Sequence, residues 1–211
     1  MGKFRQSRIF LLILFGLTLL GTQADRLHTP SLREQLENGK TAHILLLGVD
    51  ARPGEIVSRS DTIVLVSINR KIKKLALVSI PRDTRMHTAQ GSGKVNMVNQ
   101  LRGPRAVCQA VSSLLDVPVH HYALTNFTGF EQIIDALGGV QMIVDIDLVS
   151  YSSGVCLHKG YQHLNGKQAL KYARYRSPLD GDIGRTQRQQ ALLKAIGESV
   201  ARKENLPRLP A

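Results

Sequence analysis

The chain has 211 residues, enough for one full hydrophobic core and short for two. Its 28 lysines and arginines outnumber 16 acidic residues, and the formal net charge of +12 favours polyanionic partners: nucleic acid, anionic lipid headgroups, phosphorylated glycans or pyrophosphates. Aromatic residues make up 5% of the chain and tryptophan is absent, which argues against a stacking platform for single-stranded nucleic acid.

An apolar run near the N-terminus indicates export. Lys3, Arg5 and Arg8 precede the uncharged run 9–21, and basic residues before such a run keep the N-terminus in the cytoplasm. The run is short for a bilayer core of roughly 30 Å. We therefore interpret residues 1–24 either as a signal peptide cleaved near Ala24 or as a short uncleaved anchor. Both readings place the rest of the chain outside the cytoplasm, where nucleic acid is scarce.

Three short apolar runs follow a polar segment. We expect residues 25–41 to form a tether or a short helix leading off the membrane. The runs 44–49, 62–68 and 75–80 are rich in β-branched residues and predict buried strands. The basic turn 69–71 is short enough for an antiparallel hairpin.

Apolar residues at helical spacing predict four helices in the second half of the chain. We expect them from Pro104 onward, over 130–137 with a stop at Gly138-Gly139, over 168–173, and around 192–196. Residues 140–146 predict another strand, and residues 204–211 a flexible tail. The alternation predicts an α/β fold, with one sheet covered by helices in a globular domain over residues 42–203.

The cysteines and histidines give no catalytic signature. Cys108 and Cys156 form a disulfide in one interpretation and are two small buried hydrophobic residues in the other. The histidines at 120, 121, 158 and 163 lack a carboxylate at ligand spacing, so we interpret them as ordinary surface or partly buried residues. The sequence has no Gly-x-Ser-x-Gly elbow, Walker-type loop or His-Glu-x-x-His helix.

Charged residues gather where the first two predicted strands begin and end. Asp50 follows the first strand, and Arg59 and Asp61 precede the second. If these strands are antiparallel neighbours, all three side chains share one edge of the sheet. Two carboxylates there repel each other unless a cation lies between them, and a Mg²⁺-like ion shared with substrate phosphates fits that description. The alternative is a surface ion pair between Arg59 and Asp61.

A second cluster, Arg82-Asp83-Thr84-Arg85, follows the third predicted strand, and Lys94-Val95-Asn96 follows shortly after. Loops at strand ends are where α/β proteins usually form their sites, and arginines grip phosphate oxygens. Each signal is weak alone. The alternative for residues 94–96 is a polar loop flanked by glycines.

The tail of the chain is densely charged. Arg174 and Arg176 flank Tyr175, and Asp180-Gly181-Asp182 leads into a helix on which Arg185, Arg188 and Gln189 share one face. We expect no acidic partner on that face, so it predicts an external anion such as phosphate. Arg174 has a structural alternative, because a cation at a helix C-terminus complements the helix dipole.

Taken in order, these segments resemble the LytR-CpsA-Psr (LCP) family of bacterial cell-envelope phosphotransferases over about residues 43–197. The matching segments are Leu-Leu-Leu-Gly-Val-Asp at 45–50, Arg-Ser-Asp-Thr at 59–62, Ser-Ile-Pro-Arg-Asp-Thr at 79–84, Lys-Val-Asn at 94–96, residues 126–127 and 135–140, residues 163–170, Tyr-Ala-Arg-Tyr-Arg at 172–176, and residues 182–190. Three segments depart from the family pattern: the short apolar run 9–21, residues 97–101, and the compact connection 147–160 that carries Cys156.

The resemblance implies a three-layer α/β/α domain with a central mixed β-sheet. Family members transfer a glycosyl-phosphate polymer from a polyprenyl-pyrophosphate carrier to a sugar hydroxyl of peptidoglycan or another envelope acceptor. By position, Asp50 and Asp61 would hold Mg²⁺ or Mn²⁺. The residues expected to contact the pyrophosphate are Arg59, Arg82, Lys94, Arg174, Arg176, Arg185 and Gln189. Of these, Arg59, Arg82, Arg174 and Arg176 would be catalytic, and Asp83 and Asp182 are the candidate bases.

The resemblance also implies partners and a location. The donor would be a polyprenyl-pyrophosphate-linked glycan whose tail lies in an apolar groove that the stripe 130–137 could line, and nucleic acid would not be a partner. We expect a single-pass protein of the bacterial cell membrane with its C-terminal domain outside, or a secreted protein if the N-terminal segment is cleaved. The alternatives are a pyrophosphatase acting on the same lipid and a non-catalytic binder of anionic envelope polymer or lipid.

Overall fold

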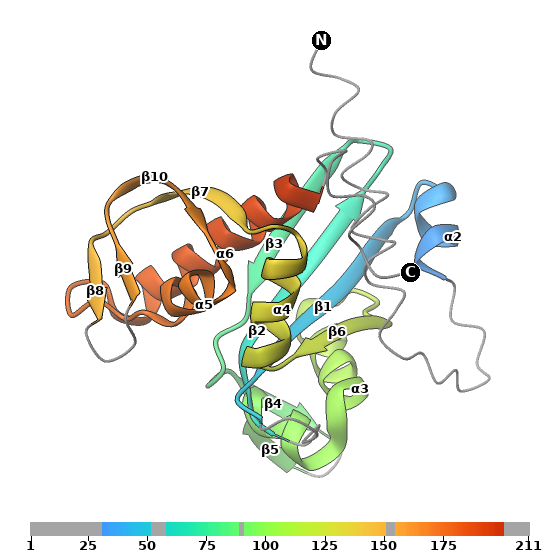
Figure 1. Ribbon diagram of the computed structural model, residues 1–211. Coiled ribbons are helices and arrows are strands. Elements are labelled where there is room, and N and C mark those ends of the chain that lie inside the picture. Colours follow the sequence, from blue (N-terminus) through green and yellow to red (C-terminus); the bar gives the residue numbers. More distant parts are fainter. Residues whose placement is uncertain (1–30, 52–57, 89–90, 151–154, 201–211) are drawn as a thin grey trace. The chain divides into compact units, whose positions relative to one another are not determined.

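The computed structural model describes residues 31–51, 58–88, 91–150 and 155–200 (Figure 1). The predicted N-terminal segment 1–24, most of the predicted tether and the predicted tail 204–211 lie outside these ranges. Within them, the helices are too short or too polar to cross a bilayer.

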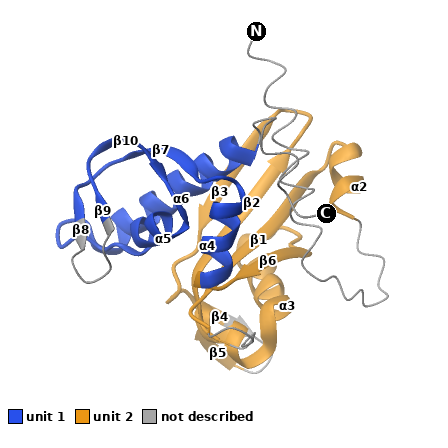
Figure 2. Cartoon of the chain, in the orientation of Figure 1, with its two compact units in different colours: residues 1–16, 128–211 blue, residues 17–127 orange. Residues whose placement is uncertain are grey.

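The chain divides into two compact units (Figure 2). Their described residues are 31–127, which we call the sheet unit, and 128–200, which we call the C-terminal unit. Each has its own cluster of buried apolar side chains, so the single core expected from the chain length is wrong.

The sheet unit contains a four-stranded mixed sheet in the order β3-β2-β1-β6. Strand β2 pairs antiparallel with both β1 and β3, while β6 runs parallel to β1. The mixed sheet and the α/β class confirm the expected fold class. The elements of this unit are α2 (Leu32–Glu37), β1 (Thr41–Val49), β2 (Ser60–Asn69), β3 (Lys74–Ser79), β4 (Arg85–Thr88), β5 (Gly91–Lys94), α3 (Val95–Leu115) and β6 (His121–Thr125).

Helix α3 packs against one face of this sheet. Alternate residues along β1 and β2, among them Leu45, Leu47 and Leu65, contact the apolar stripe of the helix, in which Val107 and Val111 are fully buried. The helix is kinked at Gly103, where a left-handed backbone (φ 76°) interrupts it before Pro104. The helix expected from Pro104 is therefore the second piece of α3, and residues 95–102 form a first piece that the sequence did not predict.

Four strand ends meet at one edge of the sheet. Val49 pairs with Ser60, Ile80 N donates to Ile63 O at 2.9 Å, and Gly48 pairs with Thr125. The pairing of β1 with β2 shifts register after Gly48, so Asp61 is the extra residue of a β-bulge. Because β1 and β2 are antiparallel neighbours, Asp50, Arg59 and Asp61 lie at the same edge, as predicted.

The C-terminal unit consists of two small antiparallel ribbons and three helices. Strand β7 pairs with β10, and β8 pairs with β9. The apolar cluster includes Ile134, Leu164, Tyr172 and Leu192, so helices predicted from these stripes are confirmed. The elements are α4 (Phe127–Ala136), β7 (Val140–Val144), β8 (Leu148–Ser150), β9 (Val155–Leu157), β10 (Gly160–Leu164), α5 (Gly166–Arg174) and α6 (Gly181–Val200).

Candidate functional site

A cavity of about 460 Å³ opens at the edge of the sheet unit where the strand ends meet. Three cations line it, two carboxylates lie among them, and an amide and a thioether complete the wall: Arg59, Arg82, Lys94, Asp61, Asp83, Asn96 and Met97. Its size suits a small-molecule headgroup. The structure thus brings together five of the predicted site residues within one unit.

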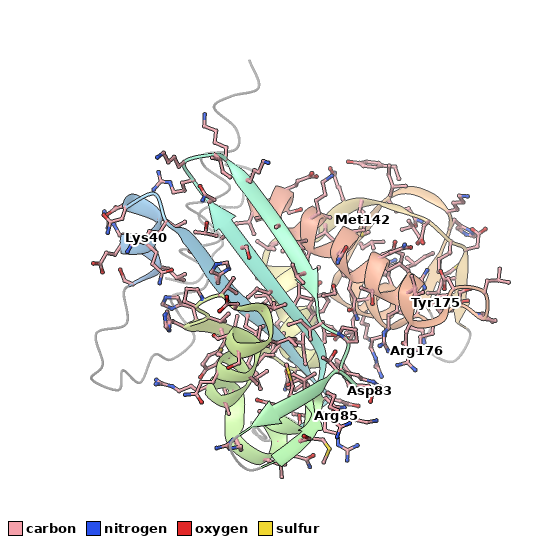
Figure 3. All side chains as sticks on the ribbon, turned by 180° about the vertical axis from the view of Figure 1, so that it is seen from behind. Lys40, Asp83, Arg85, Met142, Tyr175 and Arg176 are labelled. Carbon is pink, nitrogen blue, oxygen red and sulfur yellow. The ribbon has the colours of Figure 1, made fainter. Side chains whose placement is uncertain are left out.

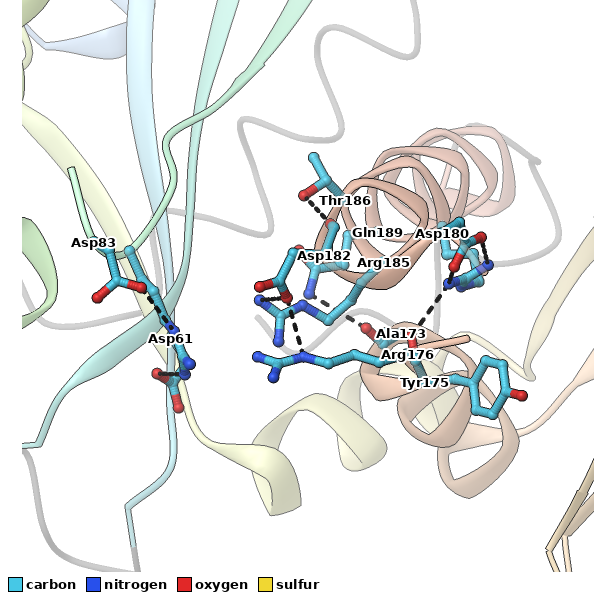
Figure 4. A network of polar contacts seen from close by, with 12 residues as sticks. Asp61, Asp83, Ala173, Tyr175, Arg176, Asp180, Asp182, Arg185, Thr186 and Gln189 are labelled. Atoms are coloured by element: carbon cyan, nitrogen blue, oxygen red, sulfur yellow. Dashed lines mark hydrogen bonds and ion pairs between the residues drawn. The ribbon is translucent and has the colours of Figure 1, made fainter. Parts of the chain in front are cut away.

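Arg82 is oriented by its backbone and by a carboxylate. The turn after β3 is closed by Thr84 N donating to Pro81 O at 2.9 Å, and Asn96 N donates to Arg82 O at 3.1 Å. The guanidinium Nη1 donates to Asp61 Oδ1 at 2.9 Å, and the side chain remains 34% exposed (Figure 4). Its Nε also lies 3.7 Å from Asp83 Oδ2, so the guanidinium lies between two carboxylates of the cavity, and a guanidinium fork can grip phosphate oxygens.

Lys94 and Asp83 form a further ion pair of the cavity. The β4–β5 ribbon pairs Arg85 with Lys94, which brings Lys94 Nζ to 2.6 Å from Asp83 Oδ1. The hydrogen bond to Lys94, with a smaller contribution from Arg82, holds the pKa of the Asp83 carboxyl below its ordinary value. A carboxylate with a lowered pKa is a weaker proton acceptor, which counts against Asp83 as the base.

Arg59 and Asp50 lie at the same edge of the sheet, and within the described part of the chain Arg59 does not form the surface ion pair with Asp61 that was considered as the alternative. Arg59 Nε donates to Gln100 Oε1 at 3.3 Å, so its partner is an amide on α3. Asp50 is exposed directly after β1. Asp50 and Asp61 provide an oxygen-donor set on adjacent strands, although the described residues contain no group of three or more His, Cys, Asp or Glu. These residues suit an ion whose other ligands are substrate oxygens and water.

The first turn of α3 adds residues that the sequence did not assign to the site. Asn96 lines the cavity and is only 7% exposed, and its buried Oδ1 atom has no hydrogen-bond partner among the described residues. Asn99 is fully buried, and its amide donates to Ser58 O at 2.7 Å, which fixes the segment before β2. Asn96 and Asn99 are three residues apart, a spacing that puts two amides on the same face of a helix. This signal could not be used because no helix was predicted over residues 95–102.

In the C-terminal unit, one carboxylate joins two of the predicted arginines. Asp182 Oδ1 lies 3.0 Å from Arg176 Nε and 2.9 Å from Arg185 Nη2 (Figure 4). The expectation that the arginine face of this helix lacks an acidic partner is therefore wrong, because Asp182 lies one turn before Arg185. Two guanidinium groups therefore share the carboxylate of Asp182.

Arg188, expected on the same exposed face, is in fact 1% exposed. Its Nη1 lies 3.0 Å from Asp180 and 3.3 Å from Asp145, and its guanidinium stacks over the Tyr175 ring at 5.5 Å. The Arg188 hydrogen bonds hold the pKa of Asp180 below its ordinary value. Tyr172 donates to Asp145 at 2.8 Å. Arg188 therefore ties β7, α5 and the loop before α6 together and does not present itself to an external anion.

The remaining predicted residues of this unit lie near the end of α5. Arg174 is the exposed last residue of that helix, and Gln189 Nε2 donates to Ala173 O at 3.3 Å. Within the C-terminal unit, Arg176, Asp182 and Arg185 thus form one contact group, while Gln189 links α6 to α5. The phosphate-binding roles of these residues stay predictions.

The cysteines are free, so the disulfide interpretation is wrong. Cys108 is buried in the apolar cluster of the sheet unit, and burial raises its pKa to about 12. Cys156 is exposed on β9. The reading of His158 also changes: its Nδ1 lies 3.6 Å from Asp147 Oδ1 and its Nε2 lies 3.5 Å from Cys156 Sγ, so a carboxylate is near it after all.

Comparison with known proteins gives a consistent set of relatives. The chain is 36% identical to the polyisoprenyl-teichoic acid–peptidoglycan teichoic acid transferase TagU of Oceanobacillus iheyensis, over 92% of this chain and 67% of that protein. It is 35% identical to the regulatory protein MsrR of Staphylococcus aureus, over 83% of this chain and 54% of that protein. The chain thus spans between about half and two thirds of the length of these relatives.

Among solved structures, a TagT with bound octaprenyl pyrophosphate lipid is similar with a TM-score of 0.61 and 34% identity, over 75% of this chain and 64% of that one. A second TagT structure, bound to LI-WTA, gives 0.62 and 35%, over 74% and 62% of the two chains. The profile of the LytR_cpsA_psr family matches residues 21–211. The chain therefore belongs to the LytR-CpsA-Psr family.

Proposed function

We propose that this protein is an extracytoplasmic phosphotransferase that moves a glycosyl-phosphate polymer from a polyprenyl-pyrophosphate carrier to a sugar hydroxyl of peptidoglycan or another envelope glycan. The observation that carries the proposal is the cavity of the sheet unit, where Arg59, Arg82 and Lys94 converge with two carboxylates. The TagU and TagT relatives support it, because one is named a teichoic acid transferase and the other binds a polyprenyl pyrophosphate.

Transfer of a glycosyl phosphate requires that the two substrates are positioned and that the negative charge of the phosphates is neutralised. The acceptor oxygen attacks the phosphorus that carries the glycan, the bond to the bridging oxygen breaks, and polyprenyl phosphate leaves. The acceptor proton passes to a base, for which Asp83 and Asp182 are the candidates, and the lowered pKa of Asp83 counts against Asp83. In our proposal, Arg82 and Lys94 stabilise the negative charge that develops on the phosphates.

A divalent cation is part of the proposal. Asp50 and Asp61 are the residues that would hold Mg²⁺ or Mn²⁺, with substrate oxygens completing the coordination. When bound, the ion would neutralise charge on the pyrophosphate. The hydrogen bond from Arg82 to Asp61 fixes that carboxylate in place, and Asp61 can use its second oxygen for the metal.

We also propose that the protein is held at the outer face of the cytoplasmic membrane. The apolar run 9–21 with its preceding basic residues supports a signal-anchor or signal-peptide function. A lipid-linked donor requires an enzyme that works close to the bilayer, which agrees with this location.

The test is an assay of the full chain with a labelled polyprenyl-pyrophosphate oligosaccharide, an acceptor glycan and Mg²⁺. We expect label on the acceptor. Free glycosyl phosphate in place of acceptor product would identify a pyrophosphatase, and unchanged donor that remains bound would identify a non-catalytic binder. Either result would overturn the proposed transfer.

The metal is tested separately by calorimetry of Mg²⁺ and a pyrophosphate analogue against the native protein and Asp50→Ala. We expect the variant to lose the metal dependence of analogue binding. Asp116→Ala is the matched control, because Asp116 caps α3 away from the cavity. Equal metal dependence in native protein and Asp50→Ala would exclude Asp50 as a ligand.

A further inference from the structure

The end of the sheet opposite the cavity is strongly basic. Lys40 directly precedes β1, the turn between β2 and β3 carries Arg70, Lys71 and Lys73, and Lys74 begins β3. The pairing of Thr41 with Asn69, and of Asn69 with Lys74, places them at one end of the sheet. We call Lys40 and residues 70–74 the basic tip. Figure 3 shows Lys40 at the end of the sheet unit away from Asp83 and Arg85.

The charges of the basic tip are not neutralised within the described part of the chain. No salt bridge there joins any of its five cations to a carboxylate. Glu37 lies beside Arg70 and Lys71 in a surface hollow, but its carboxylate pairs with Arg33 at 2.8 Å. The tip therefore presents a concentrated positive charge to an external partner.

An exposed apolar side chain lies in the middle of these cations. Ile72 is 59% exposed between Lys71 and Lys73, and Leu75 is 42% exposed next to Lys74. The turn that presents Ile72 is fixed by Ile72 N donating to Asn69 Oδ1 and by Lys73 N donating to Arg70 O. An apolar residue surrounded by lysines is typical of surfaces that lie in a bilayer interface, whereas a soluble polyanion requires only the cations.

The route of the chain keeps the basic tip near the bilayer. Helix α2 leads directly into Lys40 and lies beside the turn, with Leu36, Arg70 and Lys71 lining the same hollow. Nine residues lie between the end of the apolar run at Gly21 and Ser31, which caps α2. The ten Cα-to-Cα steps from Gly21 to Ser31 span at most about 35 Å. An anchor inserted in the membrane therefore places this end of the sheet unit within reach of the headgroups.

We propose that the basic tip binds the surface of an anionic phospholipid bilayer, with Ile72 entering the interface and the lysines contacting lipid phosphates. The proposal rests on the membrane location given above. Each cation near such a surface strengthens binding roughly fivefold, so reversing two charges is expected to weaken it at least 25-fold.

The experiment uses the full chain with Cys156→Ser, reconstituted in vesicles, with an environment-sensitive fluorophore on Ile72→Cys. Cys108 is buried and stays unlabelled. We expect a blue shift of the emission with vesicles containing phosphatidylglycerol, a smaller shift in high salt, and no shift with pure phosphatidylcholine.

Two controls accompany this measurement. The same fluorophore on Leu101→Cys, a position that is 72% exposed on α3 of the same unit, should show no shift. Lys71→Glu/Lys73→Glu should abolish the shift, whereas Arg102→Glu/Lys167→Glu, a matched change elsewhere, should not.

Three results would overturn the proposal: no shift at position 72 in vesicle-bound protein, an equal shift on neutral vesicles, or an equal shift with soluble polyphosphate in the absence of vesicles. The last result would identify a polymer-binding surface. Vesicle flotation keeps this test separate from the membrane location: protein that does not float contradicts the anchor, and protein that floats without a shift at position 72 contradicts the basic tip alone.

Discussion

Arg82 is fixed in its position from two sides. Its carbonyl accepts a hydrogen bond from Asn96 N at 3.1 Å, and its guanidinium donates to Asp61 at 2.9 Å. A side chain held in this way loses little further freedom when it binds an anion. The planar fork is then presented to the cavity in a defined orientation.

Replacing Arg82 with lysine should therefore lower the transfer rate by about 100-fold, because an ammonium group cannot contact Asp61 and a phosphate with the same fork geometry. Steady-state kinetics with the labelled donor measure the effect, and circular dichroism checks that the fold survives. Arg102→Lys, an exposed arginine outside the cavity, is the control and should keep native activity. Native turnover in Arg82→Lys would rule out the assigned role.

Lys94 should control the ionisation of Asp83. The pKa of Asp83 lies below its ordinary value because Lys94 hydrogen-bonds the charged form, so Lys94→Met should raise it. The ion pair therefore stabilises the folded protein at pH values above 3.8, the ordinary pKa of an aspartate, and this stabilisation is lost as the pH falls through the lower pKa of Asp83 in the folded state. Carboxyl-detected NMR titration measures the change. An unaltered Asp83 titration in Lys94→Met would contradict the ion pair.

At the scale of elements, helix α5 begins with a complete capping box. Asn165 Oδ1 accepts from Gln168 N at 2.9 Å, and Gln168 Oε1 accepts from Asn165 N at 3.0 Å. The helix is short, with nine residues, and its Tyr172 is part of the apolar cluster. The cap therefore supports the side of the C-terminal unit that carries Arg174 and Arg176.

Asn165→Ala should lower the free energy of unfolding by about 1 kcal/mol, because the backbone N–H of Gln168 loses its acceptor. Urea denaturation followed by circular dichroism measures this value, and hydrogen exchange should locate the change at the start of α5. Asn165→Asp preserves an acceptor at the same position and should be nearly neutral. A similar loss in both variants would show that the cap contributes little.

The sequence predicts some elements better than others for a physical reason. The strands β1, β2, β3 and β7 and the helices α4 to α6 contain apolar patterns that persist over several residues, and all are confirmed. Strand β5 reads Gly-Ser-Gly-Lys and is exposed throughout, so it has no local apolar signal and is defined only by its pairing with β4. Strand β6 likewise depends on its parallel pairing with β1.

The difference between local sequence patterns and contacts made only in the folded chain also explains which residues of the candidate site could be predicted. Asp50, Arg59, Asp61 and Arg82 could be placed together because consecutive antiparallel strands bring their ends to one edge. The contact of Lys94 with Asp83 depends on the unpredicted β4–β5 ribbon. The burial of Arg188 could not be foreseen either, since helical spacing places it beside Arg185 and only the fold brings Asp145 and Asp180 to it.

At the scale of the whole molecule, each of the two units contains one cysteine, so the reactivity of the two thiols tests the burial assigned in each unit. Cys108 belongs to the core of the sheet unit and Cys156 is exposed in the C-terminal unit. Burial also raises the pKa of Cys108 to about 12, which leaves very little thiolate near pH 8. The two thiols should therefore differ strongly in their reaction with reagents that attack thiolates.

Titration of the native, unreduced protein with a disulfide reagent should give one fast thiol, and titration in urea should give two. Cys156→Ser should remove the fast reaction and leave one thiol that appears on unfolding. No thiols in urea would mean that the cysteines are bonded to each other. Two fast thiols in the native state would contradict the burial of Cys108.

Asp61 is the extra residue of the β-bulge in β2, so it lines the cavity without taking part in the pairing of β1 with β2. Because Ser60 already pairs with Val49 and Thr62 with Gly48, removing residue 61 would leave these pairs intact and make the ladder regular. The sheet could tolerate that deletion, while Arg82 would lose the carboxylate that orients it. The candidate site residue of this strand is thus an extra residue in a ladder that pairs without it, so a change at Asp61 is expected to affect the cavity without disrupting the sheet.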